Sequence, residues 1–150
     1  MELQEEVHIP LPRDVVFTAL NDPNILQQSI PGCEQITKHS DTEMEATVVV
    51  KFGPVKASFH SDVTLDPTEG PEKFTLSGKG DAGIAGFATG GAVVTLAEEE
   101  GGTLLSYVVT IDVTGKLAQV GSRLMEGTTK RLAKKFFTNF ENALTSEAPT

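Results

Sequence analysis

Hydrophobic positions follow two different periods along this chain, and the change of period separates strand-forming residues from a long helix. Between Lys116 and Leu144, apolar residues fall on one broad side of a helix plotted at about 100° per residue, and basic residues fall on the other. At about 1.5 Å per residue this helix would be roughly 43 Å long, more than a domain of this size needs. We therefore expect a large apolar partner for its apolar side, which consists of Leu117, Leu124, Met125, Leu132, Ala133, Phe136, Phe140 and Leu144.

The residues before this helix read mainly as short β-strands punctuated by Gly, Pro and Asp. Over residues 43–52 and 55–65 apolar and polar residues alternate, which is typical of half-buried antiparallel strands, although Glu5 breaks the apolar face of the first strand. Two short helices are expected over residues 12–20 and 24–30, between Pro12 and Pro31. The pattern predicts an α+β fold in which a curved antiparallel sheet of about seven strands wraps around the long helix. The expected strands cover residues 3–9, 34–39, 43–52, 55–65, 92–98 and 103–114, with one more beginning at Phe74.

Glycines are concentrated between Gly78 and Gly91. Gly78, Gly80 and Gly83 satisfy the G-x-G-x-x-G pattern of dinucleotide-binding folds, but that pattern needs a helix after the glycines, and residues 92–98 are strand-like. We interpret the segment as a bent, bulged pair of strands, in which glycine allows tight curvature or the close approach of the helix or a ligand.

The composition indicates one domain, residues 1–144, followed by a flexible tail at residues 145–150. A chain of 150 residues with 39% hydrophobic content can bury a core of its own. The acidic N-terminus does not resemble a secretory signal, and no apolar stretch is long enough to span a bilayer as a helix. The single cysteine, Cys33, excludes an internal disulfide and is typical of a reducing compartment, so we expect a cytoplasmic protein.

The net charge of −9 is unevenly distributed. Six basic residues and one acidic residue lie between Lys116 and Lys135, so this segment carries +5 and the rest of the chain carries −14. One interpretation is a solvated helix face, and the other is a docking surface for anionic lipid or an acidic protein. Nucleic acid is not expected, because the acidic remainder would be repelled by phosphate. The predicted membrane or partner contacts are Lys116, Arg123, Lys130, Arg131 and Lys134.

No group of residues has the spacing of a catalytic or metal site. The three histidines lie on separate expected strands, and Cys33 has no histidine near it in the sequence, so neither a metal nor a catalytic residue is predicted. Tyr107 and Asp112 are the two strand residues worth testing for an enzymatic role, with Asp112 expected to face solvent.

The apolar residues offer a second kind of site. There is no tryptophan and one tyrosine, so hydrogen-bonding anchors for a polar ligand are few and any guest would be largely hydrophobic. The aromatic residues either form a plain core or partly line a cavity. On the second interpretation, the predicted ligand-binding residues are Phe52, Phe59, Phe74, Leu76, Phe87, Met125 and Phe136.

Several segments resemble one known protein family. They are Ile30–Glu34, Phe52–Val55, Leu76–Gly80, Gly86–Ala92 and Gly115–Arg123. With the order of the expected elements, they make the chain similar to the family of the G subunit of carbon monoxide dehydrogenase, within the START-related superfamily of lipid-transfer and polyketide-cyclase-like proteins. The resemblance spans most of the chain and implies the helix-grip fold of that superfamily.

This resemblance implies a non-catalytic accessory protein. Members are associated with molybdenum-containing carbon monoxide dehydrogenase or related enzymes, and are implicated in attaching them to the membrane and passing electrons to a quinone in a hydrophobic cavity. It therefore implies such an enzyme as partner, a quinone or other lipid as guest, no tightly required cofactor, and peripheral contact at the inner face of the cytoplasmic membrane. Some members continue into a hydrophobic or amphipathic tail whereas this sequence stops at Thr150, so we expect only transient membrane contact.

Two alternatives stay open at the level of sequence. A small-molecule enzyme of the cyclase or hydrolase type on the same fold would need an inward-facing carboxylate, histidine or tyrosine with a perturbed pKa. A ligand-free assembly factor would instead have an interior packed solid around Phe87 and Phe136.

Overall fold

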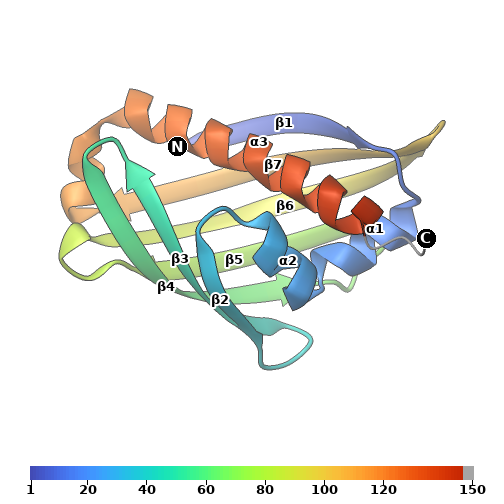
Figure 1. The fold of residues 1–150 in the computed structure, drawn as a ribbon, viewed down its shortest axis with the longest axis horizontal. Helices are drawn as coiled ribbons and strands as arrows, with labels where there is room; N and C mark the ends of the chain where they lie inside the picture. The colour runs from blue at the N-terminus through green and yellow to red at the C-terminus, as the bar shows by residue number, and fades with distance from the viewer. Residues whose placement is uncertain (147–150) are drawn as a thin grey trace.

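A curved antiparallel sheet wraps around a long helix in the computed structural model, which describes residues 1–146 (Figure 1). Within these residues the elements are β1 (Glu2–Ile9), α1 (Arg13–Leu20), α2 (Pro23–Ser29), β2 (Cys33–Lys38), β3 (Glu43–Phe52), β4 (Val55–Asp66), β5 (Lys73–Asp81), the short 3-10 helix η1 (Gly83–Ala85), β6 (Phe87–Glu99), β7 (Gly102–Thr114), the 3-10 helix η2 (Gly115–Val120) and α3 (Ser122–Ser146). The seven strands pair in the order β1-β7-β6-β5-β4-β3-β2. The predicted α+β helix-grip fold is confirmed.

The alternation in β3 sets which face of the sheet turns toward α3. Met44 and Phe52 are buried at the two ends of the strand, whereas Glu45 and Lys51 are exposed. The ladder between β3 and β4 runs without a shift in register, so the inward residues of both strands share one face. This is the arrangement that the period of two predicts.

The long helix begins later than the pattern predicts. Gly121, with φ +93°, separates η2 from α3, so the prediction of one helix starting at Lys116 is wrong. The physical reason is the left-handed backbone of Gly121, which L side chains adopt only with strain. Leu117 is nevertheless fully buried, because η2 folds against the same core. Helix α3 continues through Ser146, and residues 147–150 of the predicted tail lie outside the described residues.

The glycine-rich segment is a regular hairpin around a tight turn. β5 and β6 pair from Lys73↔Thr95 to Asp81↔Phe87 without a shift, so the predicted bulge is wrong. β6 also begins at Phe87 rather than near Ala92. Glycines within the strands pair as ordinary ladder residues that lack side chains, and η1 makes the turn.

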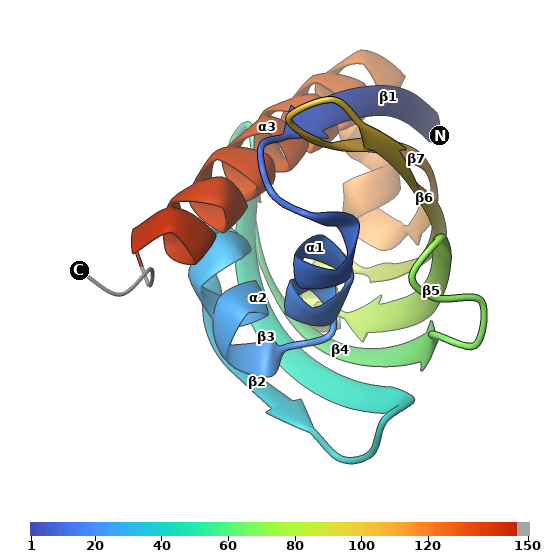
Figure 2. The same ribbon diagram turned by 90° about the vertical axis from the view of Figure 1, so that its right-hand side faces the viewer.

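Two separate clusters pack the interior, one at each end of the sheet. The first contains Val16 from α1, Ile25 from α2, and Phe74, Leu105 and Phe140. Figure 2 shows α1 and α2 lying across this end of the curved sheet. The second cluster lies at the other end, where η1 and η2 lie, and consists of Phe52, Ala57, Phe59, Ala85, Leu117 and Met125.

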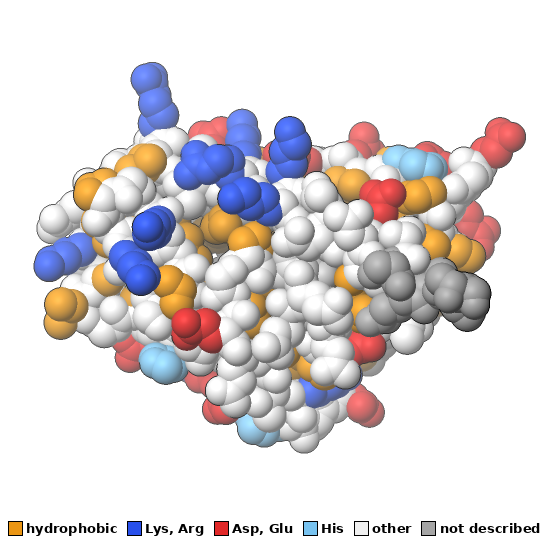
Figure 3. Space-filling view, in the orientation of Figure 1, with side chains coloured by type: hydrophobic (Ala, Val, Ile, Leu, Met, Phe, Trp, Pro, Cys, Tyr) orange, Lys and Arg blue, Asp and Glu red, His pale blue; other side chains and the backbone are white. Residues whose placement is uncertain are grey.

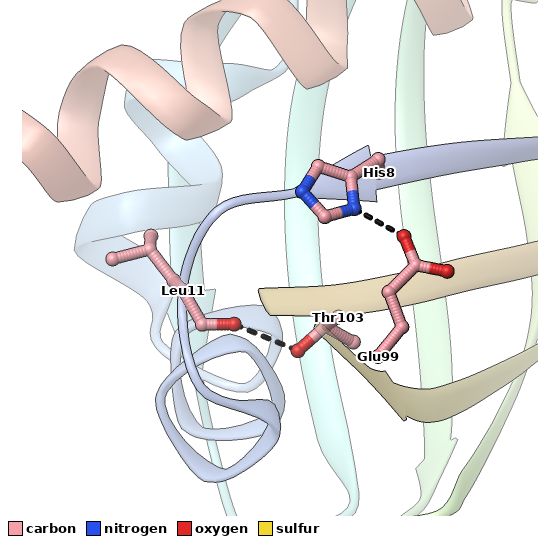
Figure 4. Close-up of polar contacts among 4 residues, drawn as sticks. All are labelled: His8, Leu11, Glu99 and Thr103. Atoms are coloured by element: carbon pink, nitrogen blue, oxygen red, sulfur yellow. Dashed lines mark hydrogen bonds and ion pairs between the residues drawn. The ribbon is translucent and has the colours of Figure 1, made fainter. Parts of the chain in front are cut away.

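Polar contacts fasten the connection from β1 to α1 onto the β6–β7 hairpin (Figure 4). The fully buried Thr103 donates its hydroxyl hydrogen to the carbonyl oxygen of Leu11, at 2.7 Å. His8 Nδ1 and the Glu99 carboxylate form a second hydrogen bond nearby. These contacts hold edge strand β1 and the start of α1 in place, so that α1 covers the end of the interior.

Candidate ligand-binding cavity

A cavity of about 390 Å³ lies between the sheet and the first half of α3, at the boundary of the two clusters. It falls within the size range of small-molecule sites in proteins. Its apolar wall consists of Val48, Phe52, Phe59, Val63, Leu76, Ala88, Ala92, Val109, Ile111, Val113, Met125 and Leu132.

The cavity exists because inward positions of β5 and β6 carry small residues. Gly78 and Gly90 face each other across the β5–β6 ladder, and Gly80 follows at the next inward position of β5. A Cβ added at Gly80 would lie 3.1 Å from Cδ1 of Phe59, so glycine also lets that ring lie close against β5. Because the glycines have no side chains, the space above the middle of the sheet stays unfilled, while both ends of the interior are packed.

The polar groups on this wall are few. Within residues 1–146, Lys79 is the only charged residue that lines the cavity, and it is exposed. The Thr129 hydroxyl donates to the carbonyl oxygen of Met125 at 2.8 Å, so its hydrogen is already used. Ser61 occupies an inward position on β4 and lines the cavity with a hydroxyl group. The site therefore suits an apolar molecule with at most a few hydrogen-bonding atoms.

The structure brings together four of the seven predicted ligand-binding residues. Phe52 and Phe59 lie at the end of the cavity next to the second cluster, with their ring centroids 6.4 Å apart in an edge-to-face pair. Leu76 lines it from β5 and Met125 from α3. Their role in binding a ligand stays a prediction.

The other three predicted residues lie elsewhere. Phe74 is buried in the first cluster, with its ring in an edge-to-face contact with Phe17. Phe136 stacks on Phe140, with centroids 5.7 Å apart. Phe87 is 37% exposed beside the β5–β6 turn. None of the three is among the residues described at the cavity wall, and their part in binding also stays a prediction.

The predicted ligand-binding residues include none of the small residues and none of the β7 residues that line the cavity, although the glycine-rich segment was expected to allow the close approach of a ligand. Val109, Ile111 and Val113 line the cavity from alternate positions of β7, a pattern that is visible in the sequence. The signal for the cavity itself is Gly78 and Gly90, which take inward positions where large apolar residues would otherwise fill the space.

Tyr107 lies in a different groove, between β1 and α3. Its ring is 4% exposed and stacks on Phe137, with centroids 5.4 Å apart. Burial raises the pKa of Tyr107 to about 12, with further contributions from the negative charge of Glu5 and the hydrogen bond to its carboxylate. This contact explains why Glu5 interrupts the apolar face of β1. The phenol is therefore neutral at physiological pH, and Asp112 is exposed, as predicted.

The predicted basic contacts are all exposed, and four of the five lie on α3. Figure 3 shows Lys and Arg side chains gathered over the half of the molecule that holds the start of α3 and the β3–β4 hairpin. Lys130 forms an ion pair with Glu126 at 3.1 Å, which reduces its availability for a partner. Lys51 and Lys135, which the pattern did not assign, line a groove with Arg131 between β3 and α3. The exposed predicted residues are Lys116, Arg123, Lys130, Arg131 and Lys134.

Neither a metal-binding cluster nor a membrane-spanning helix occurs within residues 1–146. No three His, Cys, Asp or Glu side chains in this part of the chain are placed to hold a metal ion together. In the same residues, no helix has both the length and the apolar character needed to cross a bilayer.

The curved seven-stranded sheet, the C-terminal helix and the apolar cavity between them give the chain a START-like fold of the helix-grip class. The chain belongs to the CoxG family, that of the G subunit of carbon monoxide dehydrogenase, which it matches over residues 6–145. This is a family of accessory subunits, and membership confirms the resemblance seen in the sequence.

Solved structures show the same fold at low sequence identity. A conserved protein from Geobacillus kaustophilus is 23% identical, with a TM-score of 0.89, over 97% of this chain and 96% of that one. The protein TTHA0849 from Thermus thermophilus is 15% identical, with a TM-score of 0.73, over 99% and 100% of the two chains. A START superfamily protein from Mycobacterium smegmatis is 9% identical, with a TM-score of 0.73, over 97% of each. No curated protein matches the chain. These likenesses show the fold alone.

Proposed function

We propose that this protein is a non-catalytic accessory protein of a molybdenum-containing carbon monoxide dehydrogenase-like enzyme. It binds a hydrophobic molecule, a quinone, in the cavity between the sheet and α3, and it links the enzyme to the inner face of the cytoplasmic membrane. Family membership supports the association with a carbon monoxide dehydrogenase system. The character of the cavity supports the class of guest.

The apolar wall of the cavity is the observation that carries this proposal. Each 100 Å² of apolar guest surface removed from water there contributes about 2.5 kcal/mol before the cost of immobilising the guest. A quinone ring has a size and polarity that suit such a wall, and it needs few hydrogen bonds. Ser61 lines the cavity with a hydroxyl group, and we propose it as a donor to a quinone carbonyl oxygen.

The geometry gives less support to an enzyme. Tyr107 faces the groove between β1 and α3 and holds its proton more tightly than an ordinary tyrosine, which makes it a poor general base at neutral pH. Asp112 is exposed and is not among the residues described at the cavity wall. A ligand-free assembly factor is also less well supported, because the interior beneath the first half of α3 is hollow.

Solvent extraction of the purified protein after incubation with membranes tests the proposal, with mass spectrometry and an ultraviolet spectrum of the extract. We expect an isoprenoid quinone in stoichiometric amount. Ala92→Phe should lower the amount of quinone bound per protein molecule, because the phenylalanine ring would occupy the cavity from an inward position on β6. If the ring displaces about 100 Å² of guest surface, binding weakens roughly 70-fold. Val93→Phe is the matched control, because Val93 is on the outer face of the same strand.

Two results would contradict the proposal. An extract without quinone, from protein loaded on membranes, would exclude the carrier role. Equal quinone content in Ala92→Phe and Val93→Phe would place the guest outside the cavity, even if a quinone were found.

A further inference from the structure

The turn between β5 and β6 holds a large aliphatic side chain in solvent. Ile84, in the middle of η1, is 90% exposed. The turn has a defined shape, because the Gly83 amide donates to the Asp81 carboxylate at 2.8 Å and Ala85 is buried in the second cluster. Ile84 therefore protrudes from a well-anchored turn without contributing to the core. The partly exposed Phe87 follows directly after the turn.

Three connections lie together at this end of the sheet, which we call the hairpin end: residues 53–54, 82–86 and 115–121. Because the strands are antiparallel, alternate connections leave the sheet at the same end. A Cβ added at Gly115 would lie 2.9 Å from Cα of Gly86, so η1 and η2 are in contact. A Cβ added at Gly53 would lie 2.9 Å from Cδ2 of Leu124, which places the β3–β4 turn against the start of α3. Figure 1 shows the three connections at the left of the molecule.

Exposed basic residues lie on or beside two of these connections, residues 53–54 and 115–121. Within residues 1–146 none of them takes part in an ion pair, in contrast to Lys130 and Lys73. Asp81 and Asp112 are the acidic residues near the ends of β5 and β7, and Asp81 is already engaged by the turn. The basic residues are Lys51, Lys56, Lys116 and Arg123.

The positions of Lys51 and Lys56 are unfavourable for the folded protein alone. They are paired directly opposite each other across the β3–β4 ladder, and like charges in this arrangement destabilise a hairpin. An anionic surface would relieve this repulsion. The pair therefore indicates a negatively charged binding partner at the hairpin end.

The shape of the exposed apolar group distinguishes a bilayer from a protein. A stable protein interface buries about 800 Å² on each side, which is far more than one isoleucine and part of a phenylalanine provide. A single aliphatic side chain that protrudes among cations instead suits a lipid surface, where the apolar group enters the acyl region and the cations stay at the phosphates.

We propose that the hairpin end docks on an anionic lipid bilayer, with Ile84 inserted and Lys51, Lys56, Lys116 and Arg123 at the lipid head groups. The proposal rests on the membrane link proposed above. It assigns that link to the hairpin end, which includes Lys116 and Arg123, rather than to Lys130, Arg131 and Lys134 further along α3. Docking here also brings the second cluster, which closes one end of the cavity, next to the lipid.

Cosedimentation of the full chain with lipid vesicles tests this docking surface. We expect binding to phosphatidylcholine vesicles that contain about 30 mol% phosphatidylglycerol, weaker binding at high salt, and little binding to pure phosphatidylcholine. Ile84→Ser should weaken binding about 10-fold. Val15→Ser is the matched control, since Val15 is an exposed aliphatic residue on α1 at the opposite end, and it should leave binding unchanged.

A charge reversal separates docking from folding. Lys56→Glu should weaken vesicle binding while raising the free energy of unfolding, because it places a carboxylate opposite Lys51. If Lys56 had only a structural role, the substitution would not weaken vesicle binding while increasing stability. Lys134→Glu, on the exposed face of α3, should have a smaller effect on binding than Lys56→Glu.

Three outcomes would overturn the proposal. Binding that is lost in Lys134→Glu but kept in Ile84→Ser would move the contact to the α3 face and leave the membrane link intact. Failure of the wild-type chain to bind anionic vesicles would remove the membrane link as well, while quinone extraction would still decide the carrier role. A change in oligomeric state in Ile84→Ser without vesicles would identify a second copy of the chain as the partner of Ile84.

Discussion

The alkaline titration of Tyr107 measures directly how the groove between β1 and α3 is built. Tyr107 is the only tyrosine and the chain has no tryptophan, so tyrosinate absorbance reports a single group. The ordinary pKa of a tyrosine is about 10. Burial, and then the charge and hydrogen bond of Glu5, raise the pKa of Tyr107 to about 12.

The raised pKa predicts a loss of stability at high pH with a definite sign. Between about pH 10 and 12 the unfolded chain releases the phenol proton while the folded chain keeps it. The contribution of Tyr107 to the free energy of unfolding is therefore fully present below pH 10 and falls as the pH rises through this window. A shift of about two pKa units corresponds to a loss of about 2–3 kcal/mol once the pH has risen through both pKa values.

Two variants separate the causes of this shift. Tyr107→Phe should lose this part of the pH dependence, so the difference from wild type in urea unfolding isolates Tyr107 from the lysines that titrate in the same range. Glu5→Gln should lower the absorbance midpoint but leave it above 10, because burial is the larger cause. A wild-type midpoint within about half a unit of 10 would refute the described burial and its link to Glu5.

Other predictions concern the helix break, the core and the cysteine. Gly121→Ala should lower the free energy of unfolding by about 1–2 kcal/mol because of the positive φ, whereas Gly127→Ala, with open space around the added Cβ inside α3, should raise it by about 0.5–1 kcal/mol. Urea unfolding measures both, and equal effects would contradict the break. Phe140→Ala should cost about 3–5 kcal/mol in the same assay, because the ring is fully buried, and a cost below about 1 kcal/mol would argue against its place in the core. Burial raises the pKa of the Cys33 thiol, so it should react with a thiol reagent at neutral pH more slowly in the folded protein than in urea, and equal rates would count against this burial.

The sheet was predictable because its signal is local. Alternation along β3 determines which side chains face inward, and the inward and exposed residues of this strand follow it. The helix start was not predictable in the same way. Leu117 fits the apolar periodicity of α3, although Gly121 separates Leu117 from that helix. Both Leu117 and the first turns of α3 bury against the same core, so the periodic pattern continues through a break in the backbone.

The cavity was only partly predictable, for a different physical reason. A pattern shows which face a residue occupies, but not whether the space opposite is filled. Phe59 and Phe74 both face inward, from opposite ends of the β4–β5 ladder, yet Phe59 lines the cavity while Phe74 packs against Phe17 of α1. That difference depends on which elements cover each end of the sheet, and this is information about tertiary structure.

The course of β5 explains how one strand serves both folding and the proposed binding. Its inward residues are Phe74 and Leu76 near α1, followed by Gly78 and Gly80 toward the hairpin end. Helix α3 is divided in the same way between packing and cavity. Phe140, in the second half of the helix, packs in the first cluster, while the first half of the helix spans the cavity. A guest in the cavity would therefore contact the sheet and the less supported half of α3 at once. Since these contacts exist only in the folded state, a bound guest should stabilise the protein by mass action, and most strongly in the half of α3 that precedes Leu132.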